Sequence, residues 1–424
     1  RYTERMTPTT PSVIDATSSG GPSRAKVREH FPALSDPTVF LENAGGAQVP
    51  RFVADAMHRY LLETYVQLGA GYRIADRCDA VVAGAHDLMG TVVNTSETGV
   101  VVLGPSTSQL CMMLALSYAD ILEPGDEIIL AEAGHEANIN PWLRLEAQGV
   151  RIRFWRVDPA TGHSPLEGLG ELLNERTRLV AFTHVSNLLG EIVDVAAVTR
   201  AAHAVGARVV VDGVAYAPHR AIDVAAWDVD WYAFSTYKVY GPHMAVLYGR
   251  GDAAAELRGP NHFFIADDDV PYKFELGGVN HEGCAGLLGL GHYLRVLAGG
   301  TPNGAPDRNE VERAFAVMTE LELPLQRRLL DYLASSAFRV IGPTHADASR
   351  VATISFVHPT RSAADIVAAA HAHEIGIRNG HMYAHRLCTA MGLEPEAGVV
   401  RVSMVHYNTE EEIERLIEVL RTVE

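Results

Sequence analysis

Short runs of apolar residues, bounded by polar or turn-forming residues, recur along the first two thirds of the chain. Continuous apolar runs of this length are typical of strands that are covered on both faces of a sheet. We predict seven such strands, at residues 100–104, 126–132, 150–157, 178–184, 207–213, 230–235 and 244–249. Because helical stretches such as 193–205 lie between most of them, the pattern predicts an α/β fold with a mostly parallel sheet.

The pattern changes in the last third of the chain. Residues 251–312 show a looser pattern, and 299–310 have the composition of a loop. Beyond them the spacing of apolar residues predicts helices at 311–336, 362–373 and 408–421 and strands at 351–357 and 399–404. We therefore expect three parts: a flexible leader and N-terminal segment at 1–37, a large domain at 38–298 that begins with a helix at 51–65, and a small α+β domain at 299–424.

The composition of the chain limits which partners and which cellular compartment we expect. The net charge of -17 over 424 residues argues against nucleic acid and anionic membrane as partners. The sequence has no run of about 18 apolar residues, so we expect no transmembrane helix. The four cysteines (Cys78, Cys111, Cys284 and Cys388) form no CxxC pair, which argues against a disulfide framework or a metal cluster. We expect a protein of a reducing compartment, the cytoplasm.

Polar residues that could bind a ligand or take part in a reaction follow five of the predicted strands. They are Ser106, Thr107 and Ser108; His135, Glu136 and Asn138; Ser186 and Asn187; Asp212; and Ser235 and Lys238. In open parallel sheets, ligands bind outside the carboxyl ends of the strands. A buried lysine is costly unless it is paired or neutralised, so Lys238 needs a partner at this edge. Taken singly, these residues are equally typical of helix caps and ordinary core or surface positions.

Together, these groups match the requirements of one cofactor. Pyridoxal 5'-phosphate needs a lysine to bind its aldehyde, an anion for its pyridine nitrogen and donors for its phosphate. Lys238 and Asp212 supply the first two, and the helix start after residue 104 offers free N–H groups to a phosphate. The sequence therefore predicts a pyridoxal-phosphate site at this edge of the sheet.

Residues 38–423 resemble the fold-type I pyridoxal-phosphate enzymes of aminotransferase class V, and most of all the cysteine desulfurase and selenocysteine lyase group. The stretches that carry the resemblance are HEANINPW, HVSNLLGEIVDV, VVVDGVAYAPH, FSTYKVYGPH, FELGGVNHEG and VVRVSMVHYNTEEEIERL. The resemblance implies a large cofactor domain, a small C-terminal domain and a homodimer with the active site at the interface.

The resemblance also implies roles for individual residues. Lys238 matches the Schiff-base lysine, Asp212 the carboxylate at the pyridine nitrogen, and Arg401 the arginine that binds the α-carboxylate of an amino-acid substrate. The expected cofactor contacts are Thr107, Ser108, His135, Asn187, Asp212, Val214, Ser235, Tyr237, Lys238 and Gly278. Asn43 is expected beside Arg401 in the substrate site.

Three departures from the family pattern concern the cofactor. Tyr237 stands where a phosphate-binding histidine is usual, and its hydroxyl can still donate. Ala215 replaces a glutamine that bonds the ring oxygen, so Asn187 carries more of that contact. Gly278 replaces a threonine that reaches the phosphate of the neighbouring subunit, which leaves a backbone N–H there.

A fourth departure decides the predicted reaction. Desulfurases of this group carry a persulfide-forming cysteine in an R-x-G-H-H-C segment, and here Arg378 begins the segment RNGHMY, in which Tyr383 stands at the cysteine position. Cys388 lies five residues further on, on the apolar face of a predicted helix. A tyrosine cannot accept sulfur as a thiolate does. Tyr383 either donates a proton to a leaving group or only fills the space.

We predict a pyridoxal-phosphate-dependent lyase that cleaves a C–S bond of a cysteine-derived substrate by β-elimination. The enzyme alternatives are a class V aminotransferase, epimerase or oxidative deaminase acting on another amino acid, and a desulfurase that uses Cys388. The alternative outside enzymes is a binding or scaffold protein with this fold. The set of Lys238, Asp212 and Arg401 argues against that last alternative.

Overall fold

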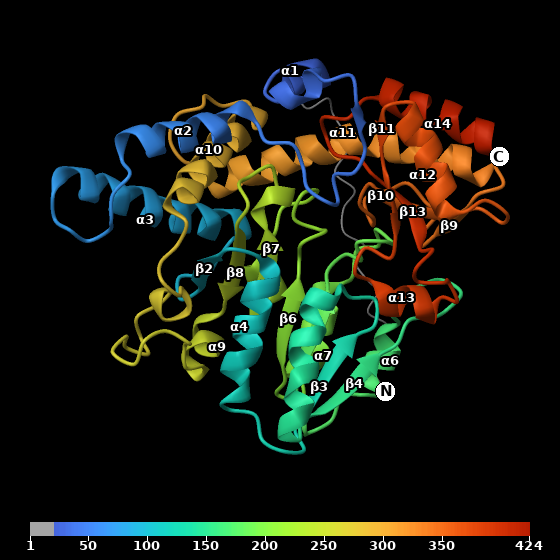
Figure 1. The fold of residues 1–424 in the computed structure, drawn as a ribbon. Helices are drawn as coiled ribbons and strands as arrows, with labels where there is room; N and C mark the ends of the chain where they lie inside the picture. The colour runs from blue at the N-terminus through green and yellow to red at the C-terminus, as the bar shows by residue number, and fades with distance from the viewer. Residues whose placement is uncertain (1–20) are drawn as a thin grey trace, which may run out of the picture.

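The computed structural model describes residues 21–424 and is built around a seven-stranded sheet (Figure 1). Its strands, in spatial order, are β2 (Val100–Gly104), β8 (Ala245–Gly249), β7 (Trp231–Ser235), β6 (Arg208–Asp212), β5 (Thr177–Thr183), β3 (Glu127–Ala131) and β4 (Arg151–Trp155). Five of these strands, β7 to β4, pair in parallel, whereas β8 runs antiparallel to both β2 and β7. The predicted α/β fold with a mostly parallel sheet of seven strands is confirmed.

Apolar side chains leave this sheet on both faces. Along β2, Val101 and Leu103 belong to one buried cluster, and their neighbours Val100 and Val102 belong to another. Successive side chains of a strand point to opposite faces, so a strand covered on both sides has to be apolar throughout. This is why the strands read as continuous apolar runs in the sequence.

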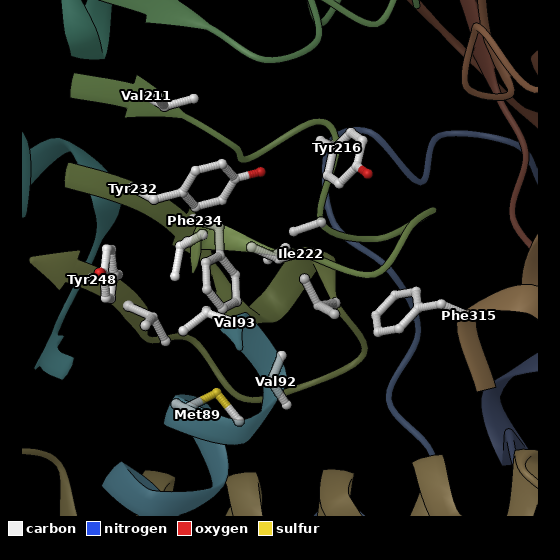
Figure 2. Packing of buried hydrophobic residues seen from close by; sticks show 14 of the residues in the cluster. Met89, Val92, Val93, Val211, Tyr216, Ile222, Tyr232, Phe234, Tyr248 and Phe315 are labelled. Atoms are coloured by element: carbon white, nitrogen blue, oxygen red, sulfur yellow. The ribbon is translucent and has the colours of Figure 1, made fainter. Parts of the chain in front are cut away.

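Helices cover the two faces of the sheet. They are α2 (Arg51–Glu63), α3 (Arg73–Val93), α4 (Thr107–Ala119), α5 (Asn140–Leu143), α6 (Leu166–Gly170), α7 (Val195–His203), α8 (Val224–Trp227), α9 (Gly251–Glu256) and α10 (His281–Leu297). Figure 2 shows how α3 packs on the sheet, where Val92 and Val93 lie close to Phe234 of β7. Met89 and Phe315 of a later helix belong to the same buried cluster. The second face is covered by α4, whose Leu110 and Leu114 are buried.

The looser pattern expected over residues 251–312 is wrong for α10. This helix packs closely on α2, and a Cβ at Gly289 would lie 2.4 Å from the carbonyl oxygen of Phe52. Close approach requires glycine, and glycine has a poor helix propensity. Tertiary packing therefore overrides the local signal that made this segment look irregular.

The last part of the chain forms a smaller α+β unit. Its antiparallel sheet has the order β12 (Arg378–Gly380), β13 (Val399–Ser403), β10 (Thr353–Val357) and β9 (Arg339–Ile341). Its helices are α11 (Arg308–Ala334), α12 (Ala363–Ala372), α13 (His385–Ala390) and α14 (Glu410–Val423). Helix α11 joins both units, because Phe315 packs in the core of the large sheet and Leu329 in that of the small one.

The N-terminal segment returns to this C-terminal unit. Strand β1 (Val39–Phe40) pairs in parallel with β11 (Ile375–Gly376), and Leu41 is buried in the core of the small unit. The predicted leader falls largely on residues 1–20, which lie outside the described residues, and α1 (Arg24–Arg28) follows it. We keep the divisions at residues 37 and 298 as a proposal. Among residues 21–424, no helix has the length and apolar composition needed to cross a membrane.

Candidate active site

A pocket lies at the carboxyl ends of the parallel strands. It is lined by Ser106, Thr107, Ser108, His135, Ala137, Thr183, Val185, Asn187, Asp212, Val214, Ala215, Ser235, Tyr237 and Lys238. All predicted cofactor contacts except Gly278 are among these residues. Ala137, Thr183 and Val185 were not predicted, although each lies within three residues of a strand-end group that was.

One end of the pocket has the donors that a phosphate needs. Ser106 caps α4 by accepting a hydrogen bond from the Gln109 N–H (3.2 Å), and this fixes the helix start beside the pocket. The hydroxyls of Thr107 and Ser235 lie 2.7 Å apart and are both buried. Tyr237, stacked on His243, adds a phenol at the same edge. Free N–H groups and the dipole of a helix start favour an anion here.

Asp212 lies deep in the pocket at the end of β6. Its Oδ1 accepts a hydrogen bond from the Val214 N–H (3.0 Å), which orients the carboxylate. Burial raises the pKa of Asp212, while the Val214 N–H and the charge of Lys238 oppose that shift. A buried carboxylate of this kind gains most from a cationic partner brought into the pocket by a ligand.

Lys238 ends the short 3-10 helix Thr236–Lys238 that directly follows β7. Thr236 fixes this turn by donating from Oγ1 to the carbonyl oxygen of Pro242 (2.6 Å). Burial lowers the pKa of Lys238 to about 8; the charge of Arg401 adds to the effect, and Asp212 and Glu42 oppose it. The amine is therefore half neutral near pH 8, far below the ordinary lysine range, and can act there as a nucleophile or base.

Lys238 is set apart from the other lysines of the chain. The sequence has three, Lys26, Lys238 and Lys273. Lys26 is exposed on α1, and the ammonium of Lys273 donates to the carbonyl oxygens of Ala254, Leu257 and Asp267 at 2.7–2.9 Å. The side chain of Lys238 forms no hydrogen bond or ion pair with any residue in the range 21–424. It alone combines a pocket position with a free amine.

His135 and Tyr383 lie together at the opening of the site. Their ring centroids are 5.1 Å apart with an angle of 39° between the planes. Burial lowers the pKa of His135 to about 4, and the charges of Lys238 and Arg401 act in the same direction. Since Nδ1 accepts a hydrogen bond from the Ala137 N–H (3.0 Å), the neutral ring carries its proton on Nε2. The ring is a flat, uncharged surface for a ligand.

Asn187 connects the pocket to the small unit. Its side-chain Nδ2 donates to the carbonyl oxygen of Met382 (2.8 Å), and its backbone carbonyl oxygen accepts from Nη1 of Arg401 (3.3 Å). The Oδ1 of Asn187 is buried and makes no hydrogen bond. Buried polar atoms are rarely left without a partner, so this amide has capacity for a ligand contact.

Arg401 is almost completely buried on β13, close to the pocket without lining it. Burial lowers its pKa to about 10, with Glu42 opposing and Arg378 adding to the effect. Its Nε makes no hydrogen bond. A guanidinium with an unused donor next to a pocket is suited to a carboxylate.

Two predicted residues lie elsewhere. Asn43 is buried and hydrogen-bonded to the carbonyl oxygen of Ser403 and to the side chains of Tyr407 and Asn408. Gly278, with φ of +87°, lines a neighbouring pocket together with Gly104 and His243. Their roles in substrate and phosphate binding remain predictions. In the described part of the chain, no group of three or more potential metal ligands occurs.

Comparisons with known proteins agree with this geometry. The profile of the family described as aminotransferase class-V matches residues 39–416. The chain is 40% identical over 419 residues to the aminotransferase-like protein FGM3 of Gibberella zeae, covering 96% of this chain and 100% of that protein. It is 31% identical over 414 residues to a cysteine desulfurase of Dickeya dadantii, covering 92% of this chain and 94% of the relative. The solved structure of the cysteine desulfurase CsdA of Escherichia coli matches with a TM-score of 0.80 at 28% identity, covering 94% of this chain and 98% of that one.

Members of this family use pyridoxal 5'-phosphate, and the pocket fits that cofactor. The hydroxyls of Thr107 and Ser235 suit the phosphate, the buried carboxylate of Asp212 suits a protonated ring nitrogen, and Lys238 offers a free amine to the aldehyde. The open Oδ1 of Asn187 and the uncharged ring of His135 complete the set.

We predict that Lys238→Ala abolishes covalent attachment of the cofactor, because no other lysine lines the pocket. Borohydride reduction followed by intact-mass measurement should show one bound cofactor on the wild-type chain and none on the variant. Lys26→Ala, at an exposed lysine, is the matched control and should behave as wild type. Reduced cofactor on the Lys238→Ala chain would refute the assignment.

We also predict a pH dependence for cofactor attachment to the apoprotein. Only the neutral amine attacks an aldehyde, so the rate should rise about tenfold per pH unit up to the Lys238 pKa of about 8 and then level off. The rate is followed by the absorbance of the bound cofactor. N-acetyl-lysine methyl ester lacks this environment, and its attachment rate should keep rising toward a pKa of about 10.4. A protein curve that rises just as far would show that the folded chain does not neutralise Lys238.

Proposed function

Because the chain belongs to the aminotransferase class V family, we propose that it is a pyridoxal-phosphate-dependent lyase that cleaves the C–S bond of a cysteine-derived amino acid by β-elimination. One observation carries the proposal. Tyr383 is 66% exposed beside His135 at the opening of the site, while Cys388, the nearest cysteine in the chain, is fully buried. The position expected for a sulfur acceptor thus holds a phenol.

The environment of Cys388 opposes a role as nucleophile. Its side chain lies in a buried cluster with Leu387 and Leu189, and burial raises the pKa of its thiol to about 11. Only a thiolate attacks sulfur at a useful rate, and accessible thiolates have lowered pKa values. Cys78, Cys111 and Cys284 are also buried, so these thiols lack the exposure that persulfide transfer requires.

The residues of the site divide the work of an elimination. The bound cofactor withdraws electrons from the substrate and so acidifies its Cα–H bond. Arg401 holds the α-carboxylate with the help of Nε, the donor that it leaves unused inside the protein. Lys238 accepts the Cα proton on Nζ, since a pKa of about 8 suits a base that works near neutral pH.

The leaving sulfur departs on the side of the site that Tyr383 occupies. Besides its contact with Asn187, this loop is held by two contacts to Glu136. The Tyr383 carbonyl oxygen accepts from the Glu136 N–H (3.0 Å), and Arg386 pairs with the Glu136 carboxylate (2.8 Å). The phenol can then donate its proton to the departing sulfur. The sulfur leaves more easily as a neutral thiol than as a thiolate. Water completes the reaction, and the products are a thiol, pyruvate and ammonia.

The proposal extends to the oligomeric state of the protein and to its cellular compartment. We propose a homodimer, supported by apolar side chains that remain exposed on the single chain, among them Phe263 at 89% and Phe264 at 69%. Exposed apolar side chains that gather into a patch often mark a contact with a partner. The free state of all four cysteines supports the cytoplasm as the compartment.

Incubation with a panel of S-substituted cysteines, cysteine and alanine tests the reaction. Release of a thiol with an equal amount of pyruvate supports elimination. Alanine with sulfide would indicate desulfuration, and conversion of the bound cofactor to its pyridoxamine form would indicate transamination. Either of the latter two outcomes as the main reaction contradicts the proposal.

Cys388→Ser should retain turnover and the same products. The substitution buries a hydroxyl in place of a thiol, which we expect to lower the free energy of unfolding by about 1–2 kcal/mol without touching the site. Turnover is measured as thiol release, and stability by thermal unfolding. A folded, cofactor-loaded Cys388→Ser protein without activity would show that this thiol is the sulfur acceptor.

Tyr383→Phe should lower kcat by roughly 10²- to 10⁴-fold, the usual contribution of a general acid. The loss should shrink for substrates whose thiol is more acidic, because they need less protonation. Tyr65→Phe provides a control at a tyrosine of almost equal exposure, 67% against 66%. If Tyr383→Phe keeps full activity for every leaving group, the phenol only fills space.

A further inference from the structure

The two arginines next to the site face each other across neighbouring strands. In the antiparallel pairing of β12 with β13, Arg378 lies directly opposite Arg401. Like charges in such a pair destabilise each other, and Arg401 is buried, which increases the cost. This arrangement needs an anion near both guanidinium groups.

Glu42 supplies that anion. Its Oε1 lies 3.3 Å from Nη1 of Arg378 and 3.8 Å from Nη2 of Arg401. It also influences the chemistry of the pocket, because its charge opposes the lowering of the pKa of both Arg401 and Lys238. No local sequence pattern singles out Glu42, which lies about 360 positions before Arg401.

Glu42 and Arg401 lie close together without forming a hydrogen bond. The Oε1 of Glu42 and the Nε of Arg401 are both buried, and neither makes a hydrogen bond. At 3.8 Å, Glu42 attracts Arg401 without forming the two-bond pair that a guanidinium and a carboxylate prefer. A second carboxylate that reached the Nε side of Arg401 would form better bonds and would repel Glu42.

The chain holds the backbone of Glu42 in place and leaves its side chain partly open to solvent. The bridge between Glu42 and Ser403 and the bond from the Ala44 N–H to the Ser403 Oγ (2.8 Å) attach this segment to the end of β13. The Glu42 side chain is 25% exposed, so it has an outlet to solvent. A Cβ at Gly45 would lie 2.2 Å from Oε1, so the carboxylate uses space that only glycine leaves at that position.

We propose that Glu42 is the counter-ion of the arginine pair in the free enzyme, and that the substrate's carboxylate displaces it from Arg401. Glu42 then sets how tightly the site holds carboxylates. This inference rests on the proposed function in one respect, namely that Arg401 binds the α-carboxylate of the substrate. It makes Glu42 a determinant of affinity that takes no part in the bond-breaking step.

Binding of propionate to the cofactor-loaded enzyme tests the inference without any reaction, because propionate has no amine. Titration calorimetry should show that Glu42→Gln binds propionate about fivefold to tenfold more tightly than wild type, since the competing charge is gone and the shape is kept. Arg401→Lys should weaken binding in both backgrounds. Tighter binding by Glu42→Gln that disappears in the double variant supports the inference.

Weaker or unchanged binding by Glu42→Gln would overturn it, since weaker binding would mean that Glu42 merely holds Arg401 in place. Gly45→Ala is a second variant that leaves Glu42 in the chain and pushes its carboxylate away from the arginines. It should also tighten propionate binding, and an unchanged affinity counts against the inference. The proposed function is scored separately by thiol release, so an enzyme that releases no thiol still reports on Glu42 through propionate.

Discussion

The amine of Lys238 has to stay uncharged in a site that already contains the cation of Arg401. Burial and that neighbouring charge together lower the Lys238 pKa to about 8, against the weaker pull of Asp212 and Glu42. A carboxylate in direct contact with Lys238 would reverse the balance and hold the amine as an ammonium ion. The site therefore keeps its anions one step away: Asp212 on the next strand, and Glu42 beside the arginines.

This balance couples segments that are far apart in the chain. Asn187, just beyond β5, holds Arg401 through its carbonyl oxygen and the Tyr383 loop through its side chain. That loop has strained backbone, since Met382 and Tyr383 both have positive φ, at 44° and 63°. Residues persist in such conformations only where surrounding contacts impose them, and such positions cluster at functional sites. A single residue beyond β5 thus contacts both the cation and the loop.

The sequence predicts what local patterns encode. The strand that leads to Lys238 was expected at 230–235 and is found at Trp231–Ser235, because a continuous apolar run followed by polar residues has few other readings. Helix α10 escaped prediction because its glycines serve a contact with α2 that no local pattern reveals. Glu42 escaped for a related reason. Its role exists only because β1 pairs with β11 and places residue 42 beside two arginines of the last third of the chain.

The difference between local sequence patterns and tertiary contacts also matters for the reaction. The match to the aminotransferase class V family covers nearly the whole chain and gives the cofactor, while the proposed difference from a desulfurase rests on where Tyr383 and Cys388 lie. Cys388 is within five residues of the expected position in sequence, yet α13 turns it into a core with Leu387 and burial keeps its thiol protonated. Tyr383 has the opposite setting, exposed and beside an uncharged His135 that does not compete for its proton. If Tyr383 donates a proton as we propose, a site with Lys238 as base and Arg401 as carboxylate partner is suited to releasing the sulfur with its substituent.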